Sequence, residues 1–316
     1  MRLLVTGGAG FIGSHLADRL LARGDRVTVL DNFDDFYDPA RKRANVARCA
    51  GHPLYRLVEG DIRDRARISS LFREERFDAV VHLAARVGVR PSIRQPALYE
   101  EVNTLGTRNL LEAAAAHGKP RFLYASSSSV YGLNAKLPFA EEDPIGRLVS
   151  PYAETKRAGE LHLLETHRVH GLTAVCLRLF TVYGPRQRPE MAIARFLRSI
   201  EAGEPIPFYG DGTSRRDYTF VDDVVDGIEA ALVAPVSFEI INLGGARPVT
   251  LTGLVQEIEA VTGREAALVR LPDQPGDVPV TFASTAKAER LLNFRARVPL
   301  TEGLSRLLAW RRTRAA

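Results

Sequence analysis

The sequence predicts an α/β protein built on a doubly wound parallel sheet, with a smaller mixed α/β lobe in its C-terminal part. Over residues 1–180, short apolar runs alternate with stretches of helical periodicity. Strands and helices that alternate at this spacing form right-handed crossovers and therefore a parallel sheet. Residues 79–85 are apolar on both faces, which is typical of a strand covered by helices on either side. The expected fold is therefore of the Rossmann type.

Each apolar run or amphipathic stretch predicts one element. Strands are expected at residues 3–6, 27–30, 54–58, 79–83, 122–125 and 174–179, and helices at residues 12–23, 65–74, 104–116 and 151–170. After residue 180 glycine and proline become frequent, and helices are expected at residues 191–202, 222–231, 251–261 and 300–311. We expect one domain at residues 1–180, joined by segments near 221–245, and a second lobe that takes up most of residues 181–316.

Composition and charge narrow the classes of protein to consider. The net charge is +5 and the pI about 9.3, but most arginines are scattered among acids. No aromatic residues interleave with the two dense basic stretches, residues 41–48 and 311–314, so we expect no nucleic-acid partner. No run of about 18 apolar residues is present, so no membrane helix is expected. Two cysteines, Cys49 and Cys176, cannot form a disulfide framework or a thiolate metal site. We expect a cytoplasmic protein without a metal.

The segment after the first expected strand has the glycine spacing of a dinucleotide-binding turn. Gly7, Gly10 and Gly13 would tighten the turn, admit a pyrophosphate and let the next helix pack closely on the strand. Asp31 ends the second expected strand, where an acid accepts hydrogen bonds from the adenine ribose and repels a 2′-phosphate. Asp61 ends the third and is placed to reach the adenine edge. The first domain is therefore expected to bind NAD rather than NADP.

Tyr152 and Lys156 lie four residues apart on the helix expected at residues 151–170, so both side chains project from one face. An ammonium beside a phenol, with the positive nicotinamide ring nearby, favours the phenolate and lowers the pKa of the tyrosine. Tyr152 is thus a candidate general base for a sugar or alcohol hydroxyl. The serine run at residues 126–129 ends the fifth expected strand, and a hydroxyl there would hydrogen-bond the reacting oxygen.

Together these motifs resemble the extended short-chain dehydrogenase/reductases over essentially the whole chain. The resemblance rests on the glycine triplet, the serine run followed by Val130-Tyr131-Gly132, and the Tyr152-x-x-x-Lys156 pair. Within that superfamily the sequence resembles the nucleotide-sugar epimerases, and most closely the UDP-glucuronate 4-epimerases. The closer likeness lies at residues 31–39, 182–185, 188–192 and 274–279.

The resemblance implies roles for individual residues at the cofactor. Ser127 matches the catalytic serine or threonine, Tyr152 the base and Lys156 its partner, and the last two also contact NAD. Further cofactor contacts are implied at Gly7, Gly10, Phe11, Ile12, Gly13, Asp31, Asn32, Asp61, Ile62, Leu83, Ala84, Ala85 and Asn103.

The resemblance also implies which residues hold a UDP-sugar. Arg216 matches the arginine that holds the diphosphate. Tyr209, Gln274 and Asp277 fall where the family holds the uridine and its ribose. Ser127 and Tyr152 would face the reacting sugar carbon. The second lobe is therefore expected to hold most of the nucleotide sugar.

Two positions after the catalytic serine bear on the reaction. Relatives that dehydrate nucleotide sugars carry an Asp-Glu pair there, and relatives that decarboxylate UDP-glucuronate carry Glu in the second place, whereas this chain has Ser128 and Ser129. Elimination and decarboxylation would lose their proton-transfer partner, which favours plain epimerisation. A glucuronate carboxylate would be held by Ser128, Thr181 or Arg188; alternatively, Arg188 is a rim or phosphate arginine.

The implied activity is epimerisation at C4 of a UDP-hexuronic acid, UDP-glucuronate to UDP-galacturonate, without decarboxylation. Tyr152 would remove the C4 hydroxyl proton while hydride passes to NAD, and the transient 4-keto sugar would be reduced from its other face. A UDP-glucose/UDP-galactose 4-epimerase is the main alternative; a UDP-glucuronate decarboxylase and an NAD-binding sensor are the others. The family also implies a homodimer through the helices at residues 104–116 and 151–170.

Overall fold

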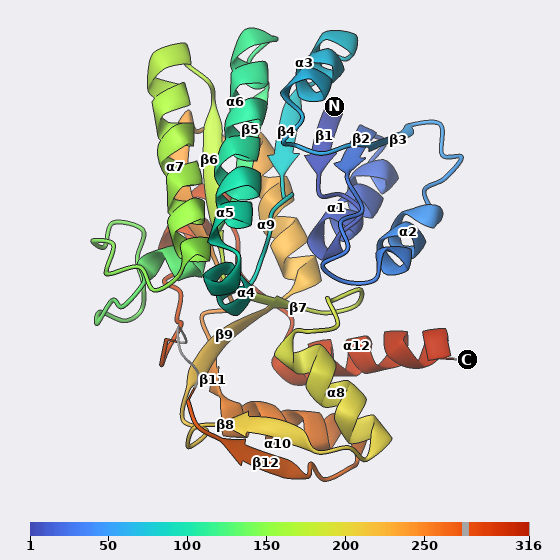
Figure 1. Cartoon of the computed structure of the whole chain (residues 1–316), viewed down its shortest axis with the longest axis vertical. Helices are drawn as coiled ribbons and strands as arrows, with labels where there is room; N and C mark the ends of the chain where they lie inside the picture. Colours follow the sequence, from blue (N-terminus) through green and yellow to red (C-terminus); the bar gives the residue numbers. More distant parts are fainter. Residues whose placement is uncertain (274–277, 316) are drawn as a thin grey trace.

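A seven-stranded, fully parallel sheet forms the centre of the computed structural model, which describes residues 1–273 and 278–315 (Figure 1). Its strand order is β10-β6-β5-β4-β1-β2-β3. The strands are β1 (Arg2–Thr6), β2 (Arg26–Asp31), β3 (Tyr55–Glu59), β4 (Ala79–His82), β5 (Arg121–Ser127), β6 (Ala174–Leu179) and β10 (Phe238–Leu243). The order reverses between β1 and β4, as in doubly wound sheets, so the expected fold class is confirmed.

Helices cover both faces of this sheet and bury two separate cores. The helices α1 (Phe11–Ala22) and α9 (Val221–Val233) pack on one face, and α3 (Arg65–Glu74), α6 (Gly106–Ala116) and α7 (Pro151–His170) on the other. Alternate residues of β1 divide between them: Leu3 and Val5 belong to the first core and Leu4 to the second. Successive strand residues point to opposite faces, which explains why the strand reads as continuously apolar.

A smaller lobe lies below the sheet in Figure 1 and is built from later segments of the chain. It contains a three-stranded sheet, β11-β9-β7, and a two-stranded parallel sheet, β12-β8. These strands are β7 (Thr181–Tyr183), β8 (Ile206–Tyr209), β9 (Arg215–Phe220), β11 (Pro248–Thr250) and β12 (Leu268–Leu271). The helices of this lobe are α8 (Ala192–Ala202), α10 (Leu251–Thr262) and α12 (Leu300–Ala315).

Several short elements were not expected from the sequence. They are α2 (Pro39–Ala47), α4 (Val89–Arg94), α5 (Pro96–Tyr99), α11 (Ala286–Leu292) and the 3₁₀ turn η2 (Ser128–Tyr131). The helix expected at residues 104–116 instead starts at Gly106, after a π-helical stretch η1 (Glu100–Leu105). α2 is polar and lacks a periodic apolar stripe, but Asp38 accepts a hydrogen bond from the Ala40 amide and Pro39 occupies the first turn, which starts the helix.

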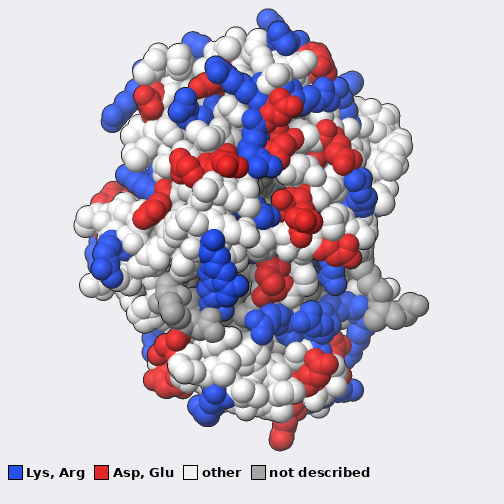
Figure 2. Space-filling model, viewed as in Figure 1, with Lys and Arg blue, Asp and Glu red and all other residues white. Residues whose placement is uncertain are grey.

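Charged residues are spread over the surface rather than divided by sign. Acidic and basic side chains alternate over much of the face drawn in Figure 2. Many arginines pair with an acid, as Arg19 does with Asp226 at 2.7 Å and Arg56 with Glu74 at 3.1 Å. Exposed pairs of this kind each contribute at most about 1 kcal/mol to stability. No helix among the described residues is long and apolar enough to cross a membrane.

Candidate active site

A cavity of about 490 Å³ opens at the carboxyl ends of the central strands, where ligands bind in doubly wound sheets. The loops that follow β1, β2, β4, β5 and β6 line it, together with Tyr152 and Lys156 of α7. Most of the cofactor residues implied by the sequence are among its lining: Gly7, Gly10, Phe11, Ile12, Gly13, Asp31, Asn32, Asp61, Ile62, Leu83, Ala84 and Ala85. So are five of the predicted catalytic and sugar residues besides Tyr152: Ser127, Ser128, Lys156, Thr181 and Arg188.

The turn between β1 and α1 requires its glycines. Gly7 has a φ of +68°, and a Cβ there would lie 2.7 Å from the Ala84 backbone nitrogen. A Cβ at Gly13 would lie 2.4 Å from the carbonyl oxygen of Gly7. The turn therefore brings the backbone of α1 to the edge of the cavity, with the amide groups of its first turn at a site suited to a pyrophosphate.

Two acids line the cavity at the ends of β2 and β3. Asp31 is buried, and its carboxylate accepts hydrogen bonds from the amides of Ala9 at 3.0 Å and Phe33 at 2.9 Å. Burial raises the pKa of Asp31, against the opposing charge of Lys42. Asp61 is half-exposed and accepts from Asn32 at 2.9 Å; burial opposes its ionisation, but hydrogen bonds from the neighbouring Arg63 and from Asn32 lower its pKa to about 2. Both acids therefore line the cavity, and their role at an adenosine stays a prediction.

Buried polar side chains form a hydrogen-bonded chain next to the loops of the cofactor site. His82 bonds through Nδ1 to Thr6 Oγ1 at 2.7 Å and through Nε2 to Thr107 Oγ1 at 2.9 Å. Burial, and secondarily the charge of Lys156, lowers the pKa of His82 to about 3, so the ring is neutral.

Asn103, which the sequence places at the cofactor, is outside the cavity lining; its amide donates to the Arg86 carbonyl at 2.9 Å.

Tyr152 lies at the N-terminus of α7, next to the end of β5. The helix begins at Pro151, and Ser150 caps it by accepting a hydrogen bond from the Ala153 amide at 3.2 Å. Burial raises the pKa of Tyr152, while hydrogen bonding with Ser127 and the charge of Arg188 oppose that rise. The structure thus brings the predicted base and serine together, whereas the protein's own residues do not produce the lowered tyrosine pKa expected from the sequence.

Lys156 is buried one helical turn after Tyr152, and its ammonium points to the strand. Nζ donates to the carbonyl oxygen of Ala125 at 2.8 Å and lies 5.0 Å from the centre of the Tyr124 ring. Burial lowers the pKa of Lys156 to about 7, and the charge of Glu160 acts against that shift. With a pKa near 7, Lys156 is only partly charged at neutral pH and lowers the pKa of Tyr152 less than the sequence predicts. The positive nicotinamide ring would have to contribute the rest.

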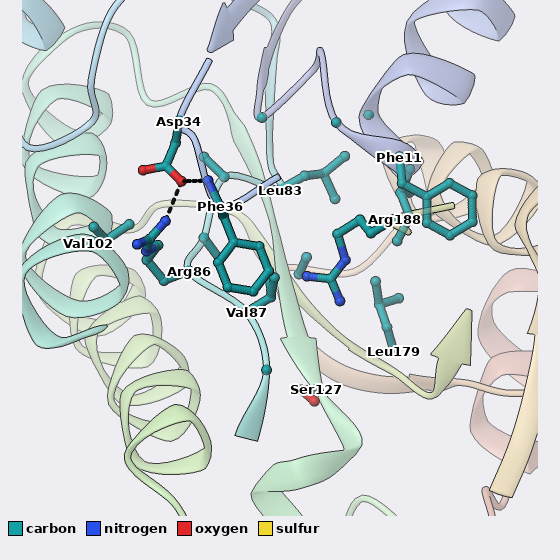
Figure 3. Close-up of a pocket in the computed structure, with 18 of the residues that line it drawn as sticks. Phe11, Asp34, Phe36, Leu83, Arg86, Val87, Val102, Ser127, Leu179 and Arg188 are labelled. Carbon is teal, nitrogen blue, oxygen red and sulfur yellow. Dashed lines mark hydrogen bonds and ion pairs between the residues drawn. The ribbon is translucent and has the colours of Figure 1, made fainter. Parts of the chain in front are cut away.

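The loop after β2 lines the cavity and contacts two arginines (Figure 3). The Phe36 ring lies between Arg86 and Arg188, with guanidinium carbons 5.3 Å and 5.9 Å from its centre. Asp34 fixes this arrangement, because its carboxylate accepts from the Phe36 amide and pairs with Arg86. Nε of Arg188 pairs with Glu190 at 3.3 Å, whereas Nη1 is buried without a hydrogen-bond partner among the described residues. Arg188 therefore offers a positive, donor-rich group to the part of the cavity that holds Ser127.

Of the predicted nucleotide residues of the second lobe, the two that the structure describes, Tyr209 and Arg216, lie outside the lining of this cavity. Tyr209 ends β8, and the guanidinium of Arg90 lies 5.3 Å from the centre of its ring. Arg216 lies on β9, where its Nη1 donates to the carbonyl of Arg215 at 2.9 Å. Gln274 and Asp277 fall outside the described residues. The roles of these four residues stay predictions.

Other lining residues were not expected from the sequence: Asp34, Phe36, Tyr37, Lys42, Arg86, Val87, Gly88, Val89, Val102 and Met191. The first three belong to the stretch at residues 31–39 that carries the closer family resemblance, so its aromatic residues were the available signal. Arg86 had no such signal, because its partner Asp34 is 52 residues away.

Comparison with known proteins agrees with this geometry. The sequence model of the NAD dependent epimerase/dehydratase family matches residues 3–244. A UDP-glucuronate 4-epimerase of Thermodesulfobacterium geofontis is 38% identical over 308 residues, which are 97% of this chain and 95% of that protein. The crystal structure of UDP-glucuronic acid 4-epimerase from Bacillus cereus, with UDP-glucuronic acid and NAD, superimposes with a TM-score of 0.92 at 35% identity over 99% of both chains. That of UDP-glucose 4-epimerase from Thermotoga maritima, with UDP-glucose, has a TM-score of 0.93 at 34% identity over the full length of both.

Proposed function

The chain belongs to the NAD dependent epimerase/dehydratase family, and on that premise we propose that it converts UDP-glucuronate to UDP-galacturonate by inverting C4. The family match confirms the resemblance drawn from the sequence. The relatives and structural neighbours likewise confirm the expected cofactor, NAD, and the enzyme class, an isomerase. The observation that supports the specific proposal most is the grouping of Ser127, Tyr152 and Arg188 around one end of the cofactor cavity.

The residues of the site fit the cofactor. The glycine turn leaves room for a pyrophosphate against the first turn of α1, and Asp31 stands where the adenine ribose hydroxyls need an acceptor. When bound, NAD supplies the acceptor for hydride from the sugar carbon and returns that hydride later in the same turnover. The remaining steps are proton transfers and binding interactions that the protein performs.

Tyr152 acts as the general base on the C4 hydroxyl, and later as the acid that returns the proton. Ser127 lines the same cavity beside Tyr152 and can hold the same sugar oxygen, so we assign the proton path to these two hydroxyls. The 4-keto sugar must present its opposite face before reduction, which requires a firmly held nucleotide and a loosely held ring. We assign the nucleotide anchor to Arg216 and Tyr209 of the second lobe.

Arg188 supports the choice of a uronic acid over a neutral sugar. Its guanidinium has a buried donor without a hydrogen-bond partner among the described residues, and a carboxylate binds such a group bidentately. Ser128 and Thr181 also line this part of the cavity and can share the carboxylate. A carboxylate held on several donors is kept from aligning its bond to C5 with the ketone, which slows loss of carbon dioxide.

A UDP-glucose 4-epimerase is the second candidate. The observation that favours it is the neighbour from Thermotoga maritima, whose structure matches this chain as well as the glucuronate enzyme does. The two candidates share the base, the serine and the cofactor. They differ in whether Arg188 binds a sugar carboxylate or lies near a neutral sugar.

Incubation of the purified holoenzyme with each UDP-sugar, without added NAD, separates the candidates. NMR of the products should show UDP-galacturonate formed from UDP-glucuronate, with turnover of UDP-glucose much slower. Conversion of UDP-glucose alone would assign the second candidate. Release of carbon dioxide with formation of a UDP-pentose would place the protein among the decarboxylases.

The proposal includes a homodimer formed through α6 and α7. Leu161 and Val169 of α7 are 49% and 68% exposed in the single chain, so this helix presents apolar side chains outward. Light scattering coupled to gel filtration should give twice the chain mass, and Leu161→Glu should lower it toward the monomer. A wild-type monomer at micromolar concentration would reject this part of the proposal.

A further inference from the structure

A buried ion pair stands behind the serine strand and has no part in the chemistry above. Glu160 of α7 and Arg178 of β6 are each 1% exposed. The guanidinium donates twice, from Nε to Oε1 at 2.8 Å and from Nη2 to Oε2 at 2.9 Å. Burying two charges costs several kcal/mol per ion before their attraction is counted, so such a pair is weak evidence for stability alone. Its position therefore requires another explanation.

Glu160 connects three elements of the active site. Besides Arg178, its carboxylate accepts a hydrogen bond from Ser126 Oγ at 2.7 Å and one from Arg157 Nη1 at 2.8 Å. Ser126 and Arg178 are neighbours across β5 and β6, and Ser126 directly precedes the predicted catalytic serine. With four donors the carboxylate is fully satisfied, and charge-assisted bonds of this kind are the strong ones.

One face of α7 contacts three consecutive residues of β5. Tyr152, Lys156 and Glu160 are spaced by four residues, which places them on the same side of the helix. Tyr152 lies near Ser127, Lys156 donates to the carbonyl of Ala125, and Glu160 accepts from Ser126, the serine between those two positions. Tyr152 and Lys156 have proposed roles in the reaction, whereas Glu160, which makes the third contact, has none. It fixes how α7 is placed along the strand.

Glu160 also determines the charge environment of Lys156. Tyr124 of β5 and His82 of β4 lie near Lys156, and Tyr152 precedes it by one turn on the same face of α7. In the chain without NAD none of them is charged at neutral pH, because burial raises the pKa of both tyrosines and lowers that of the histidine. In the described part of the chain, Glu160 is the acid whose charge opposes the loss of the Lys156 proton.

We propose that Glu160 is a positioning residue for the epimerase reaction, holding α7 in register with β5 and keeping Lys156 in its ammonium form. The inference rests on the proposed function, because it assigns Tyr152 and Lys156 their catalytic roles. Arg178 has the accompanying role of satisfying the buried carboxylate. Neither residue lines the cavity, so both act through their neighbours.

The test is the pH dependence of turnover in Glu160→Gln. Loss of the negative neighbour disfavours the ammonium, so the alkaline limb of the kcat profile should move to lower pH by about one unit. At neutral pH kcat should fall by about tenfold, with KM for the UDP-sugar changed by less than about threefold. The matched control is Arg157→Gln, which removes a half-exposed partner of the same carboxylate and should change kcat by less than about twofold.

Two further variants keep the test decisive if Glu160→Gln leaves Arg178 unpaired and fails to fold. Glu160→Gln/Arg178→Met removes both charges together, an exchange that buried pairs tolerate. The double variant should fold, and the alkaline limb of its kcat profile should move to lower pH as in Glu160→Gln. Ser126→Ala removes one hydrogen bond and leaves both charges, so kcat should fall severalfold without a shift of the alkaline limb. A folded variant lacking Glu160 that keeps the wild-type kcat and pH profile would overturn the proposal.

A second readout separates this proposal from the proposed function. Lys156 lines the cofactor cavity, so the pH at which the holoenzyme releases NAD reports its protonation without any sugar. As the pH is raised, the NAD retained after gel filtration should begin to decline at a lower pH in Glu160→Gln than in wild type. If wild type turns over no UDP-sugar, the proposed function fails, while this measurement still decides the role of Glu160: unchanged release overturns it.

Discussion

The cofactor end of the site and the end that we propose for the nucleotide sugar are built in different ways. At the cofactor end, short loops at neighbouring strand ends converge, and each acid is satisfied by nearby groups, as Asp31 is by the amides of Ala9 and Phe33. At the other end, Tyr209 and Arg216 come from two small sheets of a separate lobe and do not line the main cavity. The cofactor end is therefore held by local contacts within one domain, whereas the proposed nucleotide-sugar end depends on residues of a separate lobe.

The largest effect that tests this contrast is expected at Arg216. Arg216→Gln should raise the KM for the UDP-sugar by about 10- to 100-fold, because a charge-assisted bond to phosphate contributes about 1.5–3 kcal/mol. NAD retention should not change. Initial-rate kinetics check the first point, and the exposed neighbour Arg215→Gln is the control, with KM within about twofold. An unchanged KM in Arg216→Gln would mean that the nucleotide binds elsewhere.

Asp31→Asn tests the opposite half. The amide loses the charge that repels a 2′-phosphate and one acceptor for the ribose, so NAD retention should fall by about tenfold while NADP binding rises relative to NAD. Calorimetric titration with each dinucleotide gives the ratio. A parallel loss of both dinucleotides would indicate that Asp31 only holds the loop together.

The buried His82 makes the cofactor half sensitive to acid. Its folded-state pKa of about 3 lies below the unfolded value of about 6.5, so the unfolded chain binds the extra proton between these values. Stability contributed by the neutral ring is complete above the unfolded pKa and declines as pH falls, by up to about 1.4 kcal/mol per pH unit. Urea unfolding at neutral and mildly acidic pH should show a smaller acid loss in His82→Gln than in wild type. Equal slopes would contradict this.

The smallest effect is expected at Phe36, in the loop that follows β2. Phe36→Leu removes the ring that lies against the Arg188 guanidinium, a contact of about 0.5–1 kcal/mol, so the KM for UDP-glucuronate should rise about two- to fivefold. UDP-glucose kinetics should be unchanged, because a neutral sugar has no carboxylate for Arg188. Equal effects on both substrates would reduce Phe36 to a packing residue.

The cofactor half could be predicted from the sequence because its geometry is set locally. The spacing of Gly7, Gly10 and Gly13 fixes the turn, and an acid at a strand end faces the cavity whatever the rest of the fold does. The helix at residues 151–170 was likewise located correctly, since Pro151 and the Ser150 cap mark its start.

The remaining features depend on residues far apart in the chain. The contact of Phe36 with Arg188, and that of Asp34 with Arg86, exist only after the loops meet. The orientation of Lys156 also could not be read from its spacing to the tyrosine, because the carbonyl of Ala125 that holds it lies on another element. Asn103 shows the same limit: its amide donates to the carbonyl of Arg86, a contact that its sequence position did not indicate, and its role at the cofactor stays a prediction.

Tyr152→Phe tests the central claim most directly. The variant should retain NAD and the fold, because the phenol oxygen is the only group removed, while conversion of UDP-glucuronate to UDP-galacturonate falls by about 10²- to 10⁴-fold. NMR of the products, with bound NAD measured in the same preparation, gives both values. Conversion at the wild-type rate by a Tyr152→Phe protein with its NAD in place would contradict the account.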